Sequence, residues 1–151
     1  MKAYLAGPIA GCTVEEAMGW RKRAQAMLAE AEITCLIPLG ADEITAKTPV
    51  FCEDLGSAGR RVFEKDLFMI DQADIVLVNF TGWKAVSKGT LFELGYAYAK
   101  RKPIVAVGTT EDAKHCFIGS SCLFFPSVDR AAGYIAEMCG RDVTAALGAN
   151  P

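Results

Sequence analysis

Short apolar segments alternate along this chain with longer segments of helical period, and this alternation restricts the possible fold more than any other feature. Five segments are rich in β-branched and apolar side chains, as buried strands are: residues 2–6, 33–37, 73–80, 104–107 and 122–125. Four longer segments have the apolar periodicity of helices: residues 14–31, 60–72, 90–101 and 128–139. The pattern predicts βαβ units and an α/β fold with a mostly parallel sheet.

The first helix has the clearest start signal. Thr13-Val14-Glu15-Glu16 spells a capping box, and apolar residues then recur at 3- and 4-residue spacing. The residues expected on its buried face are Val14, Ala17, Met18, Ala24, Met27, Leu28 and Ala31. The chain of 151 residues has the length of one domain. We expect residues 1–140 to form it and residues 141–151 to be a mobile tail.

Composition excludes several classes of function. Charged residues make up 23% of the chain and the net charge is −2, so no basic face for a nucleic-acid polymer is expected. The apolar runs are too short for a signal peptide or a membrane span, which indicates a cytoplasmic protein. The six cysteines include no C-x-x-C pair and there is one histidine, so we expect reduced thiols and no metal site.

Ligands of open parallel sheets bind beyond the carboxyl ends of the strands, near the switch in strand order. This rule selects four loops: residues 7–13, 38–59, 81–89 and 108–121. The glycines of Gly7-Pro8-Ile9-Ala10-Gly11 suit a phosphate or ribose, and equally a tight turn into the first helix. Because the G-x-G-x-x-G and Walker spacings are missing, no cofactor is expected.

Two carboxylates are candidates for chemistry. Glu93 follows the loop after the third strand, where the helix amino terminus would keep it ionised as a nucleophile, although Thr90-x-x-Glu93 is also a capping box. Asp66 interrupts an apolar stripe of Val62, Phe63, Met69 and Ile70, and an exposed edge explains it equally well. If both converge, a charged Glu93 and a protonated Asp66 are the pair that glycosidic cleavage requires.

Three separated blocks of the sequence together resemble the nucleoside 2-deoxyribosyltransferase family. They are Ala3-Tyr4-Leu5-Ala6-Gly7-Pro8-Ile9; Glu64-Lys65-Asp66-Leu67-x-x-Ile70-x-x-Ala73-Asp74-Ile75-Val76-Leu77-Val78-Asn79; and Ser87-x-Gly89-Thr90-x-x-Glu93-Leu94-Gly95-Tyr96-Ala97 followed by Lys102-Pro103-Ile104. The resemblance implies a flavodoxin-like (Rossmann-like), doubly wound sheet of five parallel strands. It also implies a homo-oligomer whose sites are completed by a neighbouring subunit.

The same resemblance implies roles for individual residues. Glu93 matches the nucleophile that attacks C1′, Tyr4 the tyrosine that orients it, and Asp66 the aspartate that manages protonation of the base. The segment around His115 to Ile118 matches the one that reaches into a partner subunit's site. Implied substrate contacts are Gly7, Pro8, Ile9, Asn79, Ser87, Gly89, His115 and Phe117.

One position departs from the transferases of free nucleosides, which carry an aspartate six residues before the nucleophile. Here that residue is Ser87, as in the related nucleoside 5′-monophosphate N-glycosidases. An aspartate would repel a 5′-phosphate by about 4 kcal/mol at 4 Å for an effective dielectric of 20. Those hydrolases also carry a phosphate-binding arginine where this chain has Ala10, a role that Arg60, Arg61 or Lys88 would have to fill.

These arguments predict an enzyme that cleaves the N-glycosidic bond of a nucleoside 5′-monophosphate through a covalent intermediate on Glu93. Base exchange on 2′-deoxynucleosides is the alternative. Two rivals belong to other classes: a non-catalytic nucleotide-binding module, and an NAD-cleaving domain of the Toll/interleukin-receptor type.

Overall fold

The computed structural model describes residues 1–9, 12–38, 58–81 and 87–140. Its centre is a sheet of five parallel strands in the order β2-β1-β3-β4-β5. The strands are β1 (Lys2–Ala6), β2 (Thr34–Leu36), β3 (Ile75–Asn79), β4 (Ile104–Val107) and β5 (Leu123–Phe125). Strand order reverses between β1 and β3, which is the flavodoxin-like arrangement, and the predicted fold class is confirmed.

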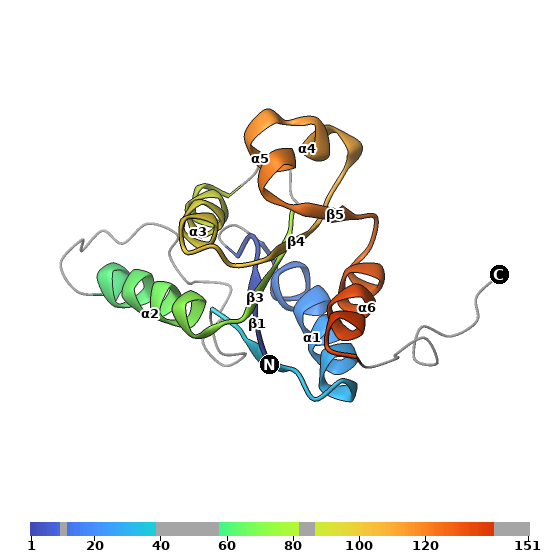
Figure 1. Ribbon diagram of the computed structural model, residues 1–151. Helices are drawn as coiled ribbons and strands as arrows, with labels where there is room; N and C mark the ends of the chain where they lie inside the picture. The colour runs from blue at the N-terminus through green and yellow to red at the C-terminus, as the bar shows by residue number, and fades with distance from the viewer. Residues whose placement is uncertain (10–11, 39–57, 82–86, 141–151) are drawn as a thin grey trace.

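Helices cover both faces of the sheet, as Figure 1 shows. On one face lie α1 (Val14–Glu30) and α6 (Val128–Met138), which pack against each other. On the other lie α2 (Ala58–Gln72) and α3 (Lys88–Ala99). Two short helices, α4 (Thr110–Lys114) and α5 (Cys116–Ser121), follow β4 and project past its carboxyl end.

Successive side chains of a strand point to opposite faces of the sheet, so the buried side chains form two cores. Leu5 and Leu77 point toward α1 and α6, where they pack with Leu28 and Ile135. Tyr4 points to the opposite face, the one covered by α2 and α3. All five residues of β3 are buried, as expected for a central parallel strand. Tyr4 is therefore held rigidly, with its hydroxyl directed into the layer that carries Glu93.

Most predicted elements are confirmed, with shifts at their ends. β1 and β4 have the predicted bounds, and α1 is capped by Thr13 and Glu16 as predicted. Val14 was expected to be buried and is 43% exposed, because it lies in the first turn of α1, before the helix reaches the sheet. Among the described residues, no helix is both long and apolar enough to cross a membrane. Residues 141–151, the expected tail, lie outside the described residues.

Candidate active site

A hydrogen bond between β1 and α3 forms the centre of the site. Tyr4 has no exposed surface, and its hydroxyl donates to Glu93 Oε1 over 2.8 Å. The two residues are 89 positions apart in the sequence, so only the folded sheet and helix layer bring them together. The orienting role predicted for Tyr4 has the contact that it requires.

The start of α3 differs from the prediction. Ser87 is the N-cap residue, and its Oγ accepts a hydrogen bond from the Thr90 backbone N–H over 3.4 Å. The helix begins at Lys88, so Glu93 lies in the second turn and not in the first. The predicted capping box of Thr90 and Glu93 is wrong, because Ser87 already caps the helix and Glu93 bonds to Tyr4 instead. Gly89 is exposed in the first turn.

Asp66 lies on α2 and is half-buried. Its Oδ1 atom is buried and has no hydrogen-bond partner among the described residues. Two members of the apolar stripe predicted around it are exposed, Val62 by 44% and Phe63 by 46%, because that part of α2 lies away from the sheet. Ile70 is fully buried as predicted. Asp66 is thus a carboxylate at the boundary of the core, with one buried oxygen that no described residue satisfies.

The two carboxyl groups are close enough to affect each other's titration. The pKa of Glu93 is raised to about 7: burial and the nearby Asp66 raise it, and the Tyr4 hydrogen bond and Arg21 lower it. Burial also raises the pKa of Asp66 to about 6. Both carboxyl groups therefore titrate close to neutral pH, and a charged Glu93 beside a protonated Asp66 stays a prediction. Burial of Glu93 outweighs the helix dipole, whose effect is confined to the first turn.

Arg21, on α1, is a residue of the site that the sequence analysis missed. It is fully buried, and four of its N–H groups donate to backbone carbonyls. The acceptors are Leu5 O at 3.2 Å, Gly7 O at 2.8 Å, Pro8 O at 3.5 Å and Ala17 O. The spacing of Ala17, Arg21, Ala24 and Leu28 places it on the apolar face of α1, and this pattern was the available signal.

The turn after β1 is the most enclosed part of the predicted substrate-binding set. Gly7 and Pro8 are buried, and Ile9 packs on the first turns of α1. A Cβ on Gly7 would lie 2.8 Å from a Trp20 ring carbon and 3.2 Å from Asn79 O, so only glycine allows this approach of β1, α1 and β3. The buried Asn79 side chain accepts from the backbone and hydroxyl of Thr81.

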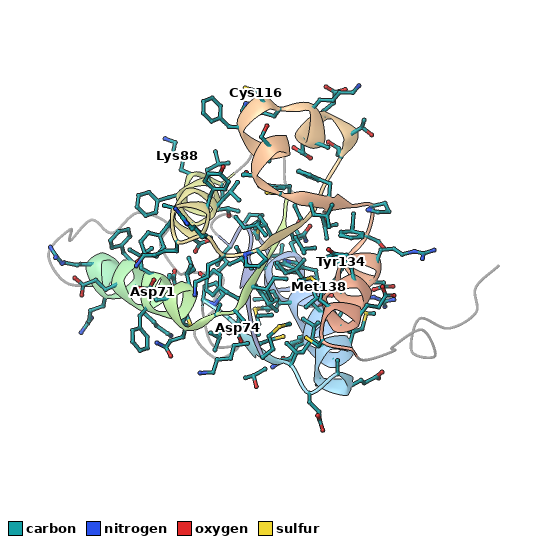
Figure 2. All side chains as sticks on the ribbon, viewed as in Figure 1. Asp71, Asp74, Lys88, Cys116, Tyr134 and Met138 are labelled. Atoms are coloured by element: carbon teal, nitrogen blue, oxygen red, sulfur yellow. The ribbon has the colours of Figure 1, made fainter. Side chains whose placement is uncertain are left out.

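Two other predicted substrate contacts, His115 and Phe117, are exposed. His115 connects α4 to α5 and is exposed, and its Nδ1 accepts from the Ile118 backbone N–H over 3.5 Å. Phe117 is 81% exposed. Figure 2 shows the neighbouring Cys116 on the excursion beyond the sheet, and Lys88 at the start of α3. Of the four predicted loops, residues 10–11, 39–57 and 82–86, Ala10 among them, lie outside the described residues.

A separate cavity of about 600 Å³ lies away from the carboxylates. Tyr98, Arg101, Lys102, Ile104 and Ser121 are among the residues that line it. Ile104 is the first residue of β4, so the cavity is at the amino end of that strand. The catalytic candidates lie toward the carboxyl ends, where open parallel sheets bind their ligands.

Comparison with known proteins identifies the family. The family model described as nucleoside 2-deoxyribosyltransferase matches residues 3–145. The chain belongs to this family. The match includes Tyr4, Asp66 and Glu93, and it confirms the resemblance found in the sequence. Members of the nucleoside 2-deoxyribosyltransferase family are glycosyl-transferring or N-glycosidase enzymes. No curated protein matches the chain.

Solved structures show the same fold within the nucleoside 2-deoxyribosyltransferase family and its neighbours. The 2-deoxyribosyltransferase of Bacillus psychrosaccharolyticus is 25% identical with a TM-score of 0.65, over 94% of this chain and 98% of that one. The 2-desoxiribosyltransferase of Leishmania mexicana is 19% identical (TM-score 0.64; 90% and 97% covered). The CMP N-glycosidase BcmB of Clostridium botulinum is 12% identical (TM-score 0.60; 91% and 99% covered).

Proposed function

We propose that this protein cleaves the N-glycosidic bond of a nucleoside 5′-monophosphate through a covalent glycosyl-enzyme on Glu93. The observation that carries the proposal is the 2.8 Å hydrogen bond from Tyr4 to Glu93, with Asp66 near enough to influence the charge of Glu93. A half-buried carboxylate that is oriented by a phenol is suited to attack an anomeric carbon. The second carboxyl group serves the departing base.

The mechanism has two steps. Glu93 bonds to C1′ in the first and is released in the second, while Asp66 gives up a proton in the first and takes one in the second. In the first, a Glu93 oxygen bonds to C1′ while the bond from C1′ to the base nitrogen breaks, and the base takes a proton from Asp66. In the second, water attacks C1′, its proton passes to Asp66, and the Glu93 carboxylate is released. Two displacements at one carbon give overall retention of configuration.

The raised pKa values are compatible with this mechanism. Because burial raises the pKa of Glu93 to about 7 and that of Asp66 to about 6, the pair can hold a single proton near neutral pH. Positive charge that develops at C1′ stabilises an ionised Glu93, while negative charge on the base favours a protonated Asp66. The reaction itself therefore draws the proton to the productive side.

Ser87 supports the 5′-monophosphate as substrate. It contributes no negative charge at the start of α3, where backbone N–H groups and the helix dipole favour an anion. Six residues separate Ser87 from Glu93, which is about 9 Å along a helix axis. A sugar whose C1′ faces Glu93 can therefore direct its 5′-phosphate toward the first turn of α3.

A second candidate, base exchange on 2′-deoxynucleosides, uses the same first step. It is favoured by the family itself and by the 25% identity to the transferase of B. psychrosaccharolyticus. The difference lies in the acceptor, which is a second free base in place of water.

We also propose that the protein assembles as a homo-oligomer through α2 and α3. These helices expose apolar side chains that a monomer would leave in water, and Phe63 on α2 contacts Phe92 on α3 with ring centroids 5.4 Å apart. The exposed set, which we call the α2–α3 apolar face, consists of Val62, Phe63, Phe68, Leu91, Phe92 and Tyr98. Large exposed apolar side chains on neighbouring helices are typical of protein interfaces.

The test is a panel of nucleosides and their 5′-monophosphates, incubated with and without a second free base and analysed by chromatography. The proposal expects free base from monophosphates, unchanged in yield when a second base is added. Exchanged product from nucleosides would establish the transferase instead.

A Glu93→Gln variant is the control for catalysis, since it keeps the side chain's shape and removes the nucleophile. Turnover should fall by orders of magnitude. A variant that still turns over its substrate at the wild-type rate would refute the role of Glu93, and a panel with no reaction at all would favour a binding module.

A further inference from the structure

Arg21 is a fully buried arginine at the carboxyl end of β1. Arginine side chains are rarely buried, yet this one has no exposed surface, and its guanidinium carbon lies 4.5 Å from the centre of the neighbouring Trp20 ring. Four donors are used by carbonyls of β1, the Gly7-Pro8 turn and α1 itself. These bonds hold the guanidinium in one orientation at the carboxyl end of β1.

Every titratable group that influences Arg21 belongs to the site or its border. Glu93 on α3, Tyr4 on β1, Cys12 before α1 and Asp66 on α2 all interact electrostatically with it. Because α1 covers the opposite face of the sheet from α2 and α3, Arg21 brings its charge to the carboxylates from the other layer. Burial lowers its pKa to about 10, so it remains charged at neutral pH.

Its charge acts on both carboxyl groups in the same direction. Arg21 lowers the pKa of Glu93 and of Asp66, against the upward effect of burial. Lys65 also lowers the pKa of Asp66, but it lies on the exposed side of α2. For Glu93, Arg21 is the cation that opposes burial.

We propose that Arg21 is a positioning residue for the reaction: it fixes the turn after β1 through its carbonyl contacts and supplies the buried positive charge that keeps Glu93 available as an anion. The inference rests on the proposed function only where it concerns catalysis. The charge effect on Glu93 is a property of the folded protein, with or without a substrate.

The experiment compares Arg21→Gln with Arg21→Lys. Glutamine keeps two donors for the carbonyls but removes the charge, whereas lysine keeps the charge. Arg23→Gln is the matched control on the same helix, because Arg23 is exposed and pairs with Asp129. Circular dichroism and thermal unfolding establish that each variant folds. Carbon-13 NMR of labelled glutamate then gives the Glu93 titration midpoint, with Glu93→Gln assigning the signal.

The expected result is a higher Glu93 midpoint in Arg21→Gln and a midpoint near the wild-type value in Arg21→Lys and Arg23→Gln. In an active enzyme, the acidic limb of kcat/KM should follow the same order. An unchanged midpoint in Arg21→Gln, an equal rise in Arg21→Lys, or failure of both Arg21 variants to fold would overturn the proposal, since each would assign Arg21 a purely structural role. If the NMR shift appears but no substrate is cleaved, the proposed function fails and this inference stands.

Discussion

Replacing Tyr4 by phenylalanine removes one hydroxyl and leaves the ring in its place among buried neighbours of β1, β3 and α3. The lost interaction is a 2.8 Å hydrogen bond to Glu93 at a position with no exposed surface. A hydrogen bond to a charged group contributes about 1.5–3 kcal/mol. If it acts fully on the ionised nucleophile, kcat/KM should fall roughly 10- to 150-fold.

The pH profile separates this effect from simple damage. The Tyr4 hydrogen bond lowers the pKa of Glu93, so its loss raises that pKa above about 7 and moves the acidic limb of kcat/KM to higher pH. Tyr96→Phe is the control, because that hydroxyl donates to the exposed Asp71 and not to Glu93. A Tyr4→Phe enzyme with the wild-type acidic limb and rate would show that Tyr4 does not orient the nucleophile.

Three further predictions concern stability and assembly. Because folding raises the pKa of Glu93 from 4.5 to about 7, its stabilising contribution is complete below about pH 4.5 and is lost as pH rises through 7. In denaturant melts near pH 8, Glu93→Gln should therefore be more stable than wild type by up to about 3 kcal/mol, and no gain would contradict the burial argument. In the same assay, Gly7→Ala should lower the free energy of unfolding by about 1–3 kcal/mol, because its Cβ would meet Trp20 and Asn79. Gly95→Ala should raise it by about 0.5–1 kcal/mol, because nothing lies within 4 Å of the added Cβ. Phe92→Glu should convert an oligomer into monomers by light scattering, and an unchanged mass would exclude the α2–α3 apolar face as the interface.

The fold could be predicted because its signals are local. β1 contains four consecutive apolar residues, Ala3 to Ala6, followed by Gly7, and α1 begins at a capping box that the structure contains. Each such signal depends on neighbouring residues alone, so it remains visible in a single sequence. The helix start at Ser87 was misjudged because Ser87 and Thr90 both suit an N-cap, and only the folded backbone decides between them.

The electrostatics of the site depend on packing and were therefore predicted poorly. Glu93 was expected to stay ionised because it is near a helix start, but burial between the neighbouring layers raises its pKa to about 7. Arg21 precedes Lys22 and Arg23, so in the sequence it belongs to a run of three basic residues, which is typical of an exposed surface. Only its position on the face of Ala17 and Ala24 distinguishes it, and three of its four carbonyl partners lie 13 to 16 residues away in the sequence.

The charges of the site also bear on how a phosphorylated substrate would bind. Glu93 and Asp66 outnumber Arg21, so the described cluster is negative when both are ionised, which suits a sugar that becomes positive in the transition state. The same cluster would repel a phosphate. A 5′-monophosphate must therefore keep its phosphate away from the carboxylates, and the start of α3, with Ser87 as N-cap and Lys88 as the first helical residue, offers it a helix amino terminus without a carboxylate at the cap. Substituting Ser87 by aspartate should accordingly weaken monophosphates far more than nucleosides, and equal loss for both would refute this placement of the phosphate.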